Sequence, residues 1–211
     1  WGARSFDVSM KKAAAGGHIE IVILCKSWGA DNVHGALNLA ARNGHIDIIE
    51  QCKEWGFNNY SRDCAMEVAV WMGHIDVVLL FKKWGTPCTK YTWTNASSAG
   101  QYHIVKLLLE WDPTHINDGM DCAAHEGYIN IVQLCLENGA TSYARTISTA
   151  VKCGDIEMIN LFKGRVPDKY IENAIAEAAP WVELFKYGSG PLFDKRKKIR
   201  SSRGISTQCG N

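Results

Sequence analysis

Three histidines recur with the same neighbours and are the first candidates for chemistry. His18, His45 and His74 each follow a glycine and precede an isoleucine and an acidic residue. A row of imidazoles could hold a metal ion or act as a general base. Alternatively, each side chain bonds to the backbone of a neighbouring copy. Copies on adjacent packed helices lie about 10 Å apart, too far to share one metal ion, so the sequence favours the structural role.

The cysteines could form disulfides or bind zinc, but their placement favours neither. Three of the eight occupy one position of a repeating pattern, at which other copies carry Phe or Leu: Cys25, Cys52 and Cys135. A position shared by Cys, Phe and Leu is typical of a core, where a thiol acts as a small hydrophobe. No CxxC pair occurs, so we expect free thiols, no metal site and no cofactor.

Catalytic motifs are missing from the sequence. There is no nucleophile elbow, phosphate loop or zinc-protease motif. Asp47 and Asp76 occur once per repeat and suit the first turn of a helix. Because nothing assembles a catalytic constellation, we expect a non-enzymatic protein.

Basic residues gather near the end of the chain. Residues 192–211 carry a net charge of +5 and the preceding residues −4, within a total of +1. The basic side chains are Lys195, Arg196, Lys197, Lys198, Arg200 and Arg203. They could form a nuclear signal, contact nucleic acid or an acidic surface, or be a solvated tail.

A fixed period organises the rest of the sequence. Glycines recur at 17, 44, 73, 100, 127 and 154, so the spacing is 27 residues, once 29. Such a period is typical of stacked units. We number positions from this glycine as zero.

Each unit has the pattern of two helices. Before the glycine, position −4 is always alanine and position −7 always apolar, which places both on one helix face. Ranges 36–43, 65–72 and 119–126 are predicted as first helices. After it, apolar residues at +4, +5 and +8 predict a second helix, for example Ile48, Ile49 and Cys52. A fixed alanine indicates that another helix crosses closely.

Residues 40–49, Ala-Ala-Arg-Asn-Gly-His-Ile-Asp-Ile-Ile, resemble the helix–turn–helix centre of the ankyrin repeat. The resemblance covers roughly residues 5–188, but the ankyrin period is about 33 residues. It therefore implies an all-α, ankyrin-like helix-turn-helix solenoid with shortened or absent β-hairpin fingers. Only short segments remain for the fingers, such as 31–34, 87–90, 114–117 and 141–144.

The short repeat, with Gly-His-Ile-Asp-Ile and Cys-Lys-Glu-Trp-Gly, is similar to ankyrin-like families of large DNA viruses of amoebae, the marseillevirus group. The resemblance implies a viral, intracellular protein of the host cytoplasm, with the nucleus or virion as alternatives. No apolar run could span a bilayer and no signal peptide is visible. Because the chain starts at Trp1 and not at Met, we expect a segment to precede it.

The predicted domains are a repeat array over 1–188 and a basic flexible tail over 189–211. The array has six clear repeats and a degenerate C-terminal cap, with a first helix at 170–179 and a truncated second helix at 181–186. A segment rich in glycine, residues 188–191, separates the two parts.

Repeat proteins of this kind bind other proteins along the edge formed by first helices and loops, as the resemblance implies. We therefore expect a protein–protein interaction scaffold or adaptor. The candidate binding residues stand at −2 and −1: Arg42, Asn43, Trp71, Met72, His125 and Glu126. The alternative is a structural component of a viral particle or assembly, with the tail on nucleic acid or capsid.

Tryptophans raise two open alternatives. Trp28, Trp55, Trp84 and Trp111 share position +11 and either pack on a neighbouring repeat or form a stacking ladder for a ligand. Trp71 and Met72 are either an exposed interface anchor or are covered by a bulkier loop, since their repeat follows the 29-residue spacing.

Overall fold

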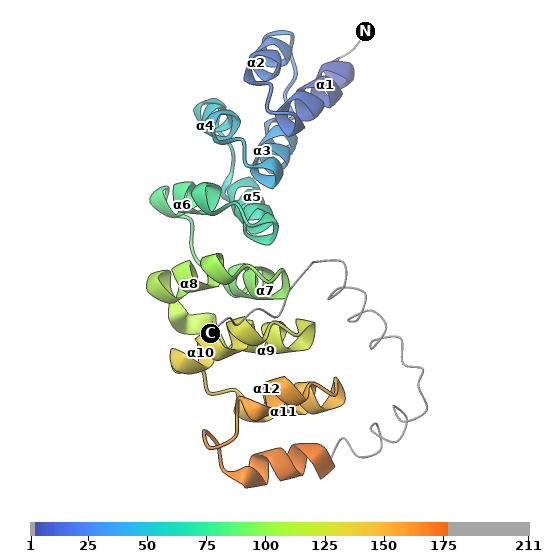
Figure 1. Cartoon of the computed structure of the whole chain (residues 1–211). Helices are drawn as coiled ribbons and strands as arrows, with labels where there is room; N and C mark the ends of the chain where they lie inside the picture. The colour runs from blue at the N-terminus through green and yellow to red at the C-terminus, as the bar shows by residue number, and fades with distance from the viewer. Residues whose placement is uncertain (1–2, 177–211) are drawn as a thin grey trace, which may run out of the picture. The chain divides into compact units, whose positions relative to one another are not determined.

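The computed structural model describes residues 3–176, and no β-strand occurs among them. The fold is all-α, as the periodicity predicted. The chain divides into two compact units, Trp1–His115 and Ile116–Asn211, which are described separately below (Figure 1). The prediction of a single array over 1–188 stays a prediction.

The first unit contains four helical pairs and a short 3-10 helix. Its helices are α1 (Ala3–Ala15), α2 (Ile19–Ser27), α3 (Val33–Asn43), α4 (Ile46–Trp55), α5 (Asn59–Met72), α6 (Ile75–Lys83), α7 (Lys90–Ser98), α8 (Tyr102–Trp111) and η1 (Pro113–His115). The second unit contains α9 (Ile116–Glu126), α10 (Ile129–Glu137), α11 (Tyr143–Lys152) and α12 (Ile156–Asn160). Residues 168–176 are also helical.

Each pair folds on itself and stacks on the next one. In the first unit, α1 packs on α2, α3 on α4, α5 on α6 and α7 on α8, while the first helices pack in series from α1 through α3 and α5 to α7. In the second unit, α9 packs on α10 and α11, and α11 on α12. Figure 1 shows the pairs as successive layers within each unit.

The core is the alanine face that the repeat predicted. All six alanines at −4 are buried: Ala13, Ala40, Ala69, Ala96, Ala123 and Ala150. The apolar residues at −7 are buried with them: Met10, Leu37, Met66, Trp93, Met120 and Ile147. Because alanine has a minimal side chain, the helices that meet there can approach closely.

The first helices begin earlier than the predicted ranges. The prediction placed their starts at 36, 65 and 119, whereas α3 begins at Val33, α5 at Asn59 and α9 at Ile116. Asparagines explain two of these starts, since Asn32 accepts a hydrogen bond from the Gly35 amide and Asn58 from the Ser61 amide. The earlier starts shorten the loops further, and none of them forms a β-hairpin in the described residues.

The extra residues of the 29-residue spacing lengthen the N-terminal end of α5. This helix has 14 residues, against 11 in α3 and 9 in α7. Trp71 and Met72 lie at the opposite, C-terminal end of α5. The interpretation that a bulkier loop folds over them is therefore wrong.

Glycines with a positive φ angle follow the ends of four second helices in the described residues, where this conformation stops a helix at low cost. Positive φ angles occur at Gly29, Gly56, Gly85 and Gly139. The sixth second helix, α12, has only 5 residues and ends at Asn160. The segments 181–186 and 189–211 fall outside the described residues. Among residues 3–176, no helix has the length and apolar character needed to span a bilayer.

Candidate partner-binding surface

A side chain at +1 of one pair bonds to the backbone of the preceding pair. His45 Nε2 lies 3.2 Å from the carbonyl oxygen of Ala15, and His74 Nε2 lies 2.8 Å from that of Arg42. Gln101 Nε2 donates to the carbonyl oxygen of Trp71 at 3.0 Å. All three acceptors stand at −2, near a helix C-terminus, where carbonyls lack partners within the helix. The structural role predicted for His45 and His74 is confirmed.

The turn glycine makes room for this inter-pair hydrogen bond. A Cβ added to Gly44 would lie 2.9 Å from Nδ1 of His74, and one added to Gly73 would lie 2.6 Å from Oε1 of Gln101. Both glycines also have positive φ, which L side chains rarely adopt. The glycine therefore serves the contact between pairs as well as the turn within one pair.

We expect His74→Ala to lower the free energy of unfolding by about 0.5–1.5 kcal/mol, the net contribution of one hydrogen bond. His74→Gln should retain most of it, because Gln101 makes the same bond in the next pair. Urea denaturation of the three chains measures the difference. Equal losses in both variants would contradict the inter-pair bond as the cause.

The inter-pair bonds fix the backbone beneath the candidate binding residues. Arg42 and Trp71 supply their main-chain carbonyls to His74 and Gln101, while their side chains stay outside the core. Trp71 is 47% exposed and Met72 is 36% exposed, and we call these two residues the lip. An anchored backbone fixes the points from which these side chains leave the surface before any partner arrives.

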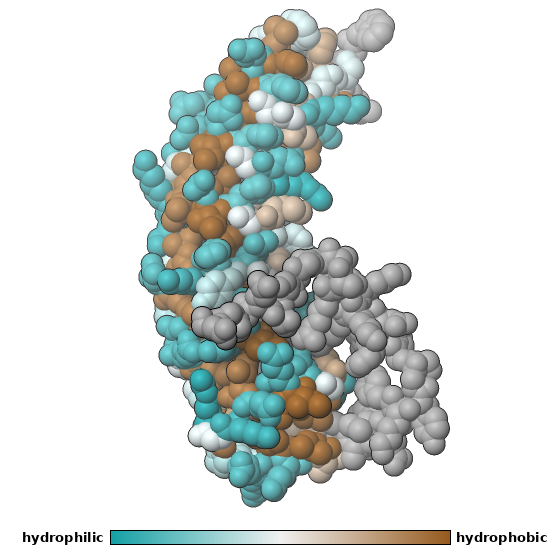
Figure 2. All heavy atoms as spheres, viewed as in Figure 1, coloured by the Kyte–Doolittle hydropathy of each residue, from teal (hydrophilic) through white to brown (hydrophobic). Residues whose placement is uncertain are grey.

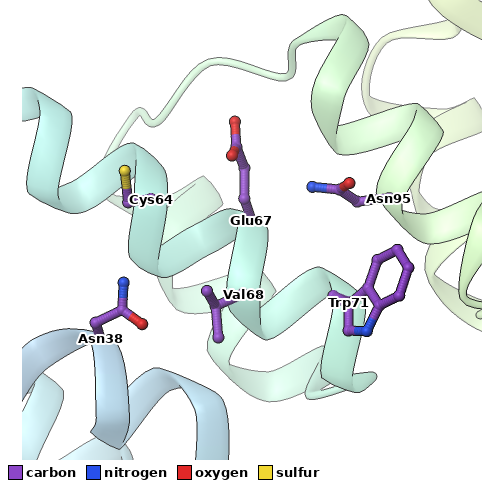
Figure 3. A pocket seen from close by; sticks show the side chains of 6 residues that line it. All are labelled: Asn38, Cys64, Glu67, Val68, Trp71 and Asn95. Atoms are coloured by element: carbon purple, nitrogen blue, oxygen red, sulfur yellow. The ribbon is translucent and has the colours of Figure 1, made fainter.

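Beside the lip lies an open hollow of about 360 Å³ on the first-helix face. It is lined by Asn38 from α3, Asn95 from α7 and four residues of α5: Cys64, Glu67, Val68 and Trp71. The four α5 residues are spaced three, four and seven apart, so they form one stripe of that helix. Figure 3 shows Glu67 rising from α5 into this space, with the Asn95 amide pointing toward it and Trp71 at one end.

The carboxyl group of Glu67 is the acidic centre of the hollow. Partial burial raises the pKa of Glu67, and the nearby charge of Asp63 raises it further. Asp63 itself pairs with Arg62, whose Nη2 lies 2.9 Å from Asp63 Oδ1. Glu67 has no such ion pair among the described residues, so a donor or cation from a partner would be favourable there.

His125 and Glu126 belong to the second unit. Both side chains are exposed at the end of α9, and His125 Nδ1 lies 2.9 Å from Glu126 Oε1. In the first unit, Arg42 and Asn43 lie at the end of α3, which packs on α5. The structure thus groups Arg42, Asn43 and the lip on adjoining helices.

The tryptophans at +11 support the packing interpretation. A lysine from the preceding pair lies over each of three indoles: Lys26 over Trp55 at 5.9 Å, Lys53 over Trp84 at 4.3 Å and Lys82 over Trp111 at 5.3 Å. Cation–π contacts of this kind contribute about 0.5–1 kcal/mol at exposed sites. These three rings are half-buried and join neighbouring pairs.

The thiols in the core are not poised for chemistry. Cys25, Cys52 and Cys135 are buried and free, as predicted. Burial raises the pKa of Cys52 and of Cys135 to about 12, so both are neutral near pH 7. Among residues 3–176, no group of three or more His, Cys, Asp or Glu side chains could hold a metal ion.

Most residues that line the hollow were not predicted from the sequence. Asn38, Glu67 and Asn95 were not singled out, although Asn38 and Glu67 stand at −6, on the helix face opposite the buried alanine at −4, and Asn95 stands at −5. Polar residues on the outer face of consecutive first helices were the sequence signal that could have indicated this surface. The basic residues of 195–203 lie outside the described part of the chain.

No family model matches the chain, and no curated protein matches it significantly.

Proposed function

We propose that this chain is a non-enzymatic protein-interaction scaffold that binds its partner on the first-helix face of the first unit. The observation that carries the proposal is the exposed lip beside a hollow, on a backbone fixed by inter-pair hydrogen bonds. Exposed apolar clusters on a soluble surface commonly mark interaction sites.

The lining of the surface defines what a partner segment must offer. An apolar or cationic group would lie on the Trp71 indole, and a hydrogen-bond donor or cation would meet Glu67. The amides of Asn38 and Asn95 can each donate and accept hydrogen bonds. A peptide segment that alternates apolar and basic residues fits this lining.

The ankyrin-like repeat class and the viral origin of the chain are also proposals. Helix–turn–helix pairs of 27-residue period, short loops and the alanine face support an ankyrin-like solenoid without β-hairpin fingers. The Gly-His-Ile-Asp motif supports an origin in a large DNA virus of amoebae, with host or viral proteins as partners.

The proposal is tested by affinity purification from host-cell extract followed by mass spectrometry. Three baits are compared: the native chain, Trp71→Ala and Leu79→Ala. Leu79 is the matched control, because it is 42% exposed but lies on α6 and outside the hollow. A partner at the lip is retained by the native chain and Leu79→Ala and lost from Trp71→Ala. If no protein follows that pattern, the lip is not the binding site.

The second candidate is a structural part of a particle whose tail touches nucleic acid, and the cluster of basic residues at 195–203 favours it. We expect the full chain to bind nucleic acid with an affinity that falls steeply with salt, because each neutralised phosphate releases counterions. Deleting residues 192–211 should abolish this binding. Filter binding between about 50 and 200 mM salt measures it, and binding that survives the deletion would exclude the tail.

A further inference from the structure

Three polar side chains of the hollow lack a hydrogen-bond partner within residues 3–176. Asn38, Glu67 and Asn95 are half-buried and come from α3, α5 and α7. None of these side chains donates or accepts a hydrogen bond among the described residues. Figure 3 shows them around one space. Because partly desolvated polar groups gain when they are paired, a ligand that supplies the missing bonds would be favoured here.

A flat apolar surface adjoins the carboxylate of this lining. Trp71 follows Glu67 by four residues, so the two side chains are neighbours on one face of α5. The indole is 47% exposed, and the bond from Gln101 holds its main chain. An aromatic face beside a carboxylate is complementary to a planar cation, which can stack on the ring and donate to the carboxylate oxygens.

The charge of the hollow favours a cation over an anion or an apolar group. None of the six lining residues is basic. Asp63, one helical turn before Glu67, adds negative charge that its ion pair with Arg62 offsets only in part, because Asp63 and burial still raise the pKa of Glu67. An anion would be repelled, and an apolar side chain would leave the carboxylate unpaired.

The neighbouring surface is polar as well. Figure 2 shows mostly hydrophilic side chains at the edge of α3 and α5 in the first unit, whereas hydrophobic ones gather over α4 and α6. A partner that binds at this edge therefore needs a polar or charged anchor besides any apolar contact with the lip.

The size of the hollow suits one side chain. Its volume of about 360 Å³ lies at the small end of ligand sites, which span about 300–1,000 Å³. Because the hollow is open, a side chain of a bound segment can enter it while the backbone of that segment stays outside.

Arginine fits this lining better than lysine does. A guanidinium is planar, presents five N–H donors and is weakly hydrated, whereas the lysine ammonium is a compact and strongly hydrated charge. The polar groups of the hollow are spread over three helices that pack in series, with axes about 8–10 Å apart. A planar fork of donors can reach several of them while it lies on the indole.

We propose that the hollow receives one arginine side chain of the partner. The guanidinium lies on the Trp71 indole and donates to the Glu67 carboxylate. The amide oxygens of Asn38 and Asn95 accept its remaining N–H groups, and its methylene stem contacts Val68. The inference rests on the proposed function, since the arginine belongs to the segment that binds beside the lip.

The test titrates a blocked amino acid into the isotope-labelled full chain. N-acetylarginine amide is added while NMR follows the side-chain amides of Asn38 and Asn95 and the indole N–H of Trp71. We expect these signals to shift and saturate. The lysine and citrulline derivatives should bind at least about tenfold more weakly, because lysine lacks the planar fork and citrulline lacks the charge.

Glu67→Gln separates the charge of the site from its shape. Glutamine is nearly isosteric and removes the repulsion from Asp63, so the chain should stay folded. The affinity for the arginine derivative should fall by about tenfold or more, as for the loss of a hydrogen bond to a charged group. Glu50→Gln is the matched control, because Glu50 is exposed on α4 outside the hollow, and it should leave the affinity unchanged.

Three results would overturn the inference. One is equal affinity for the arginine, lysine and citrulline derivatives, and another is an unchanged affinity in Glu67→Gln. The third is guanosine monophosphate binding at these signals more tightly than the arginine derivative, because a nucleobase would then be the group that stacks on Trp71.

The purification experiment tells this inference apart from the proposed function. With Glu67→Gln and Glu50→Gln as further baits, a partner lost from Trp71→Ala should also be lost from Glu67→Gln and kept by Glu50→Gln. A partner that Glu67→Gln retains would contradict the arginine anchor and leave the scaffold proposal standing. Saturable arginine binding in an extract without any partner at the lip would count against the scaffold proposal alone.

Discussion

Trp71→Ala should weaken the affinity for the partner by about 2 kcal/mol or more, the range of an interface hot spot. The free energy of unfolding should stay nearly unchanged, because the indole is 47% exposed and its contribution to the joint between pairs is a main-chain carbonyl. Calorimetric titration with the purified partner measures the first quantity and urea denaturation measures the second.

Trp93→Ala is the matched control for this experiment. Trp93 is fully buried in α7, and its Nε1 donates to the carbonyl oxygen of Asp112 at 2.8 Å. Its truncation should cost about 3–5 kcal/mol of folding free energy, as for buried aromatic residues generally. A Trp71→Ala chain that loses stability as Trp93→Ala does would show that Trp71 packs rather than binds.

Ala40→Leu and Ala123→Leu should each lower the free energy of unfolding by about 1–3 kcal/mol through overpacking. Both alanines are fully buried at the position where first helices cross, one in each unit. A leucine there would push α3 or α9 away from the helices packed on it. Thermal and urea denaturation measure the loss.

Ala144→Leu is the control for the alanine experiment. Ala144 lies in α11 but is exposed, so the added side chain meets solvent and the change should stay within about 0.5 kcal/mol. Unchanged stability in Ala40→Leu and Ala123→Leu would contradict the close crossing that the repeat predicts.

The periodic part of the fold was predictable because burial repeats with it. Ala40 and Leu37, three residues apart, already placed one helix face inside, and Ile48 and Ile49 placed the next one. Helix starts were less predictable, since Asn32 and Asn58 cap by single side-chain bonds that no period encodes. Which of the remaining side chains are exposed depends on the packing of neighbouring pairs, which the period alone does not give.

The candidate surface was predictable only in part. Variation at −2 and −1 pointed to Trp71 and Met72, which are exposed. Glu67 and Asn95 escaped notice because their role depends on α5 and α7 lying side by side. The sequence predicted that His74 bonds to the backbone of a neighbouring copy. Only the structure identifies the acceptor, which is the carbonyl of Arg42 at −2.

The joint between pairs, which is the hydrogen bond from a side chain at +1 to the backbone at −2, uses an acceptor group that every amino acid possesses. Its acceptors are the main-chain carbonyls of Ala15, Arg42 and Trp71, three residues with nothing else in common. Mutation at −2 can therefore exchange a methyl group, a guanidinium or an indole without altering the frame that presents it. Gene duplication followed by substitution at position −2 would generate chains of the same architecture with unrelated targets, much as antibody loops diversify on a constant framework.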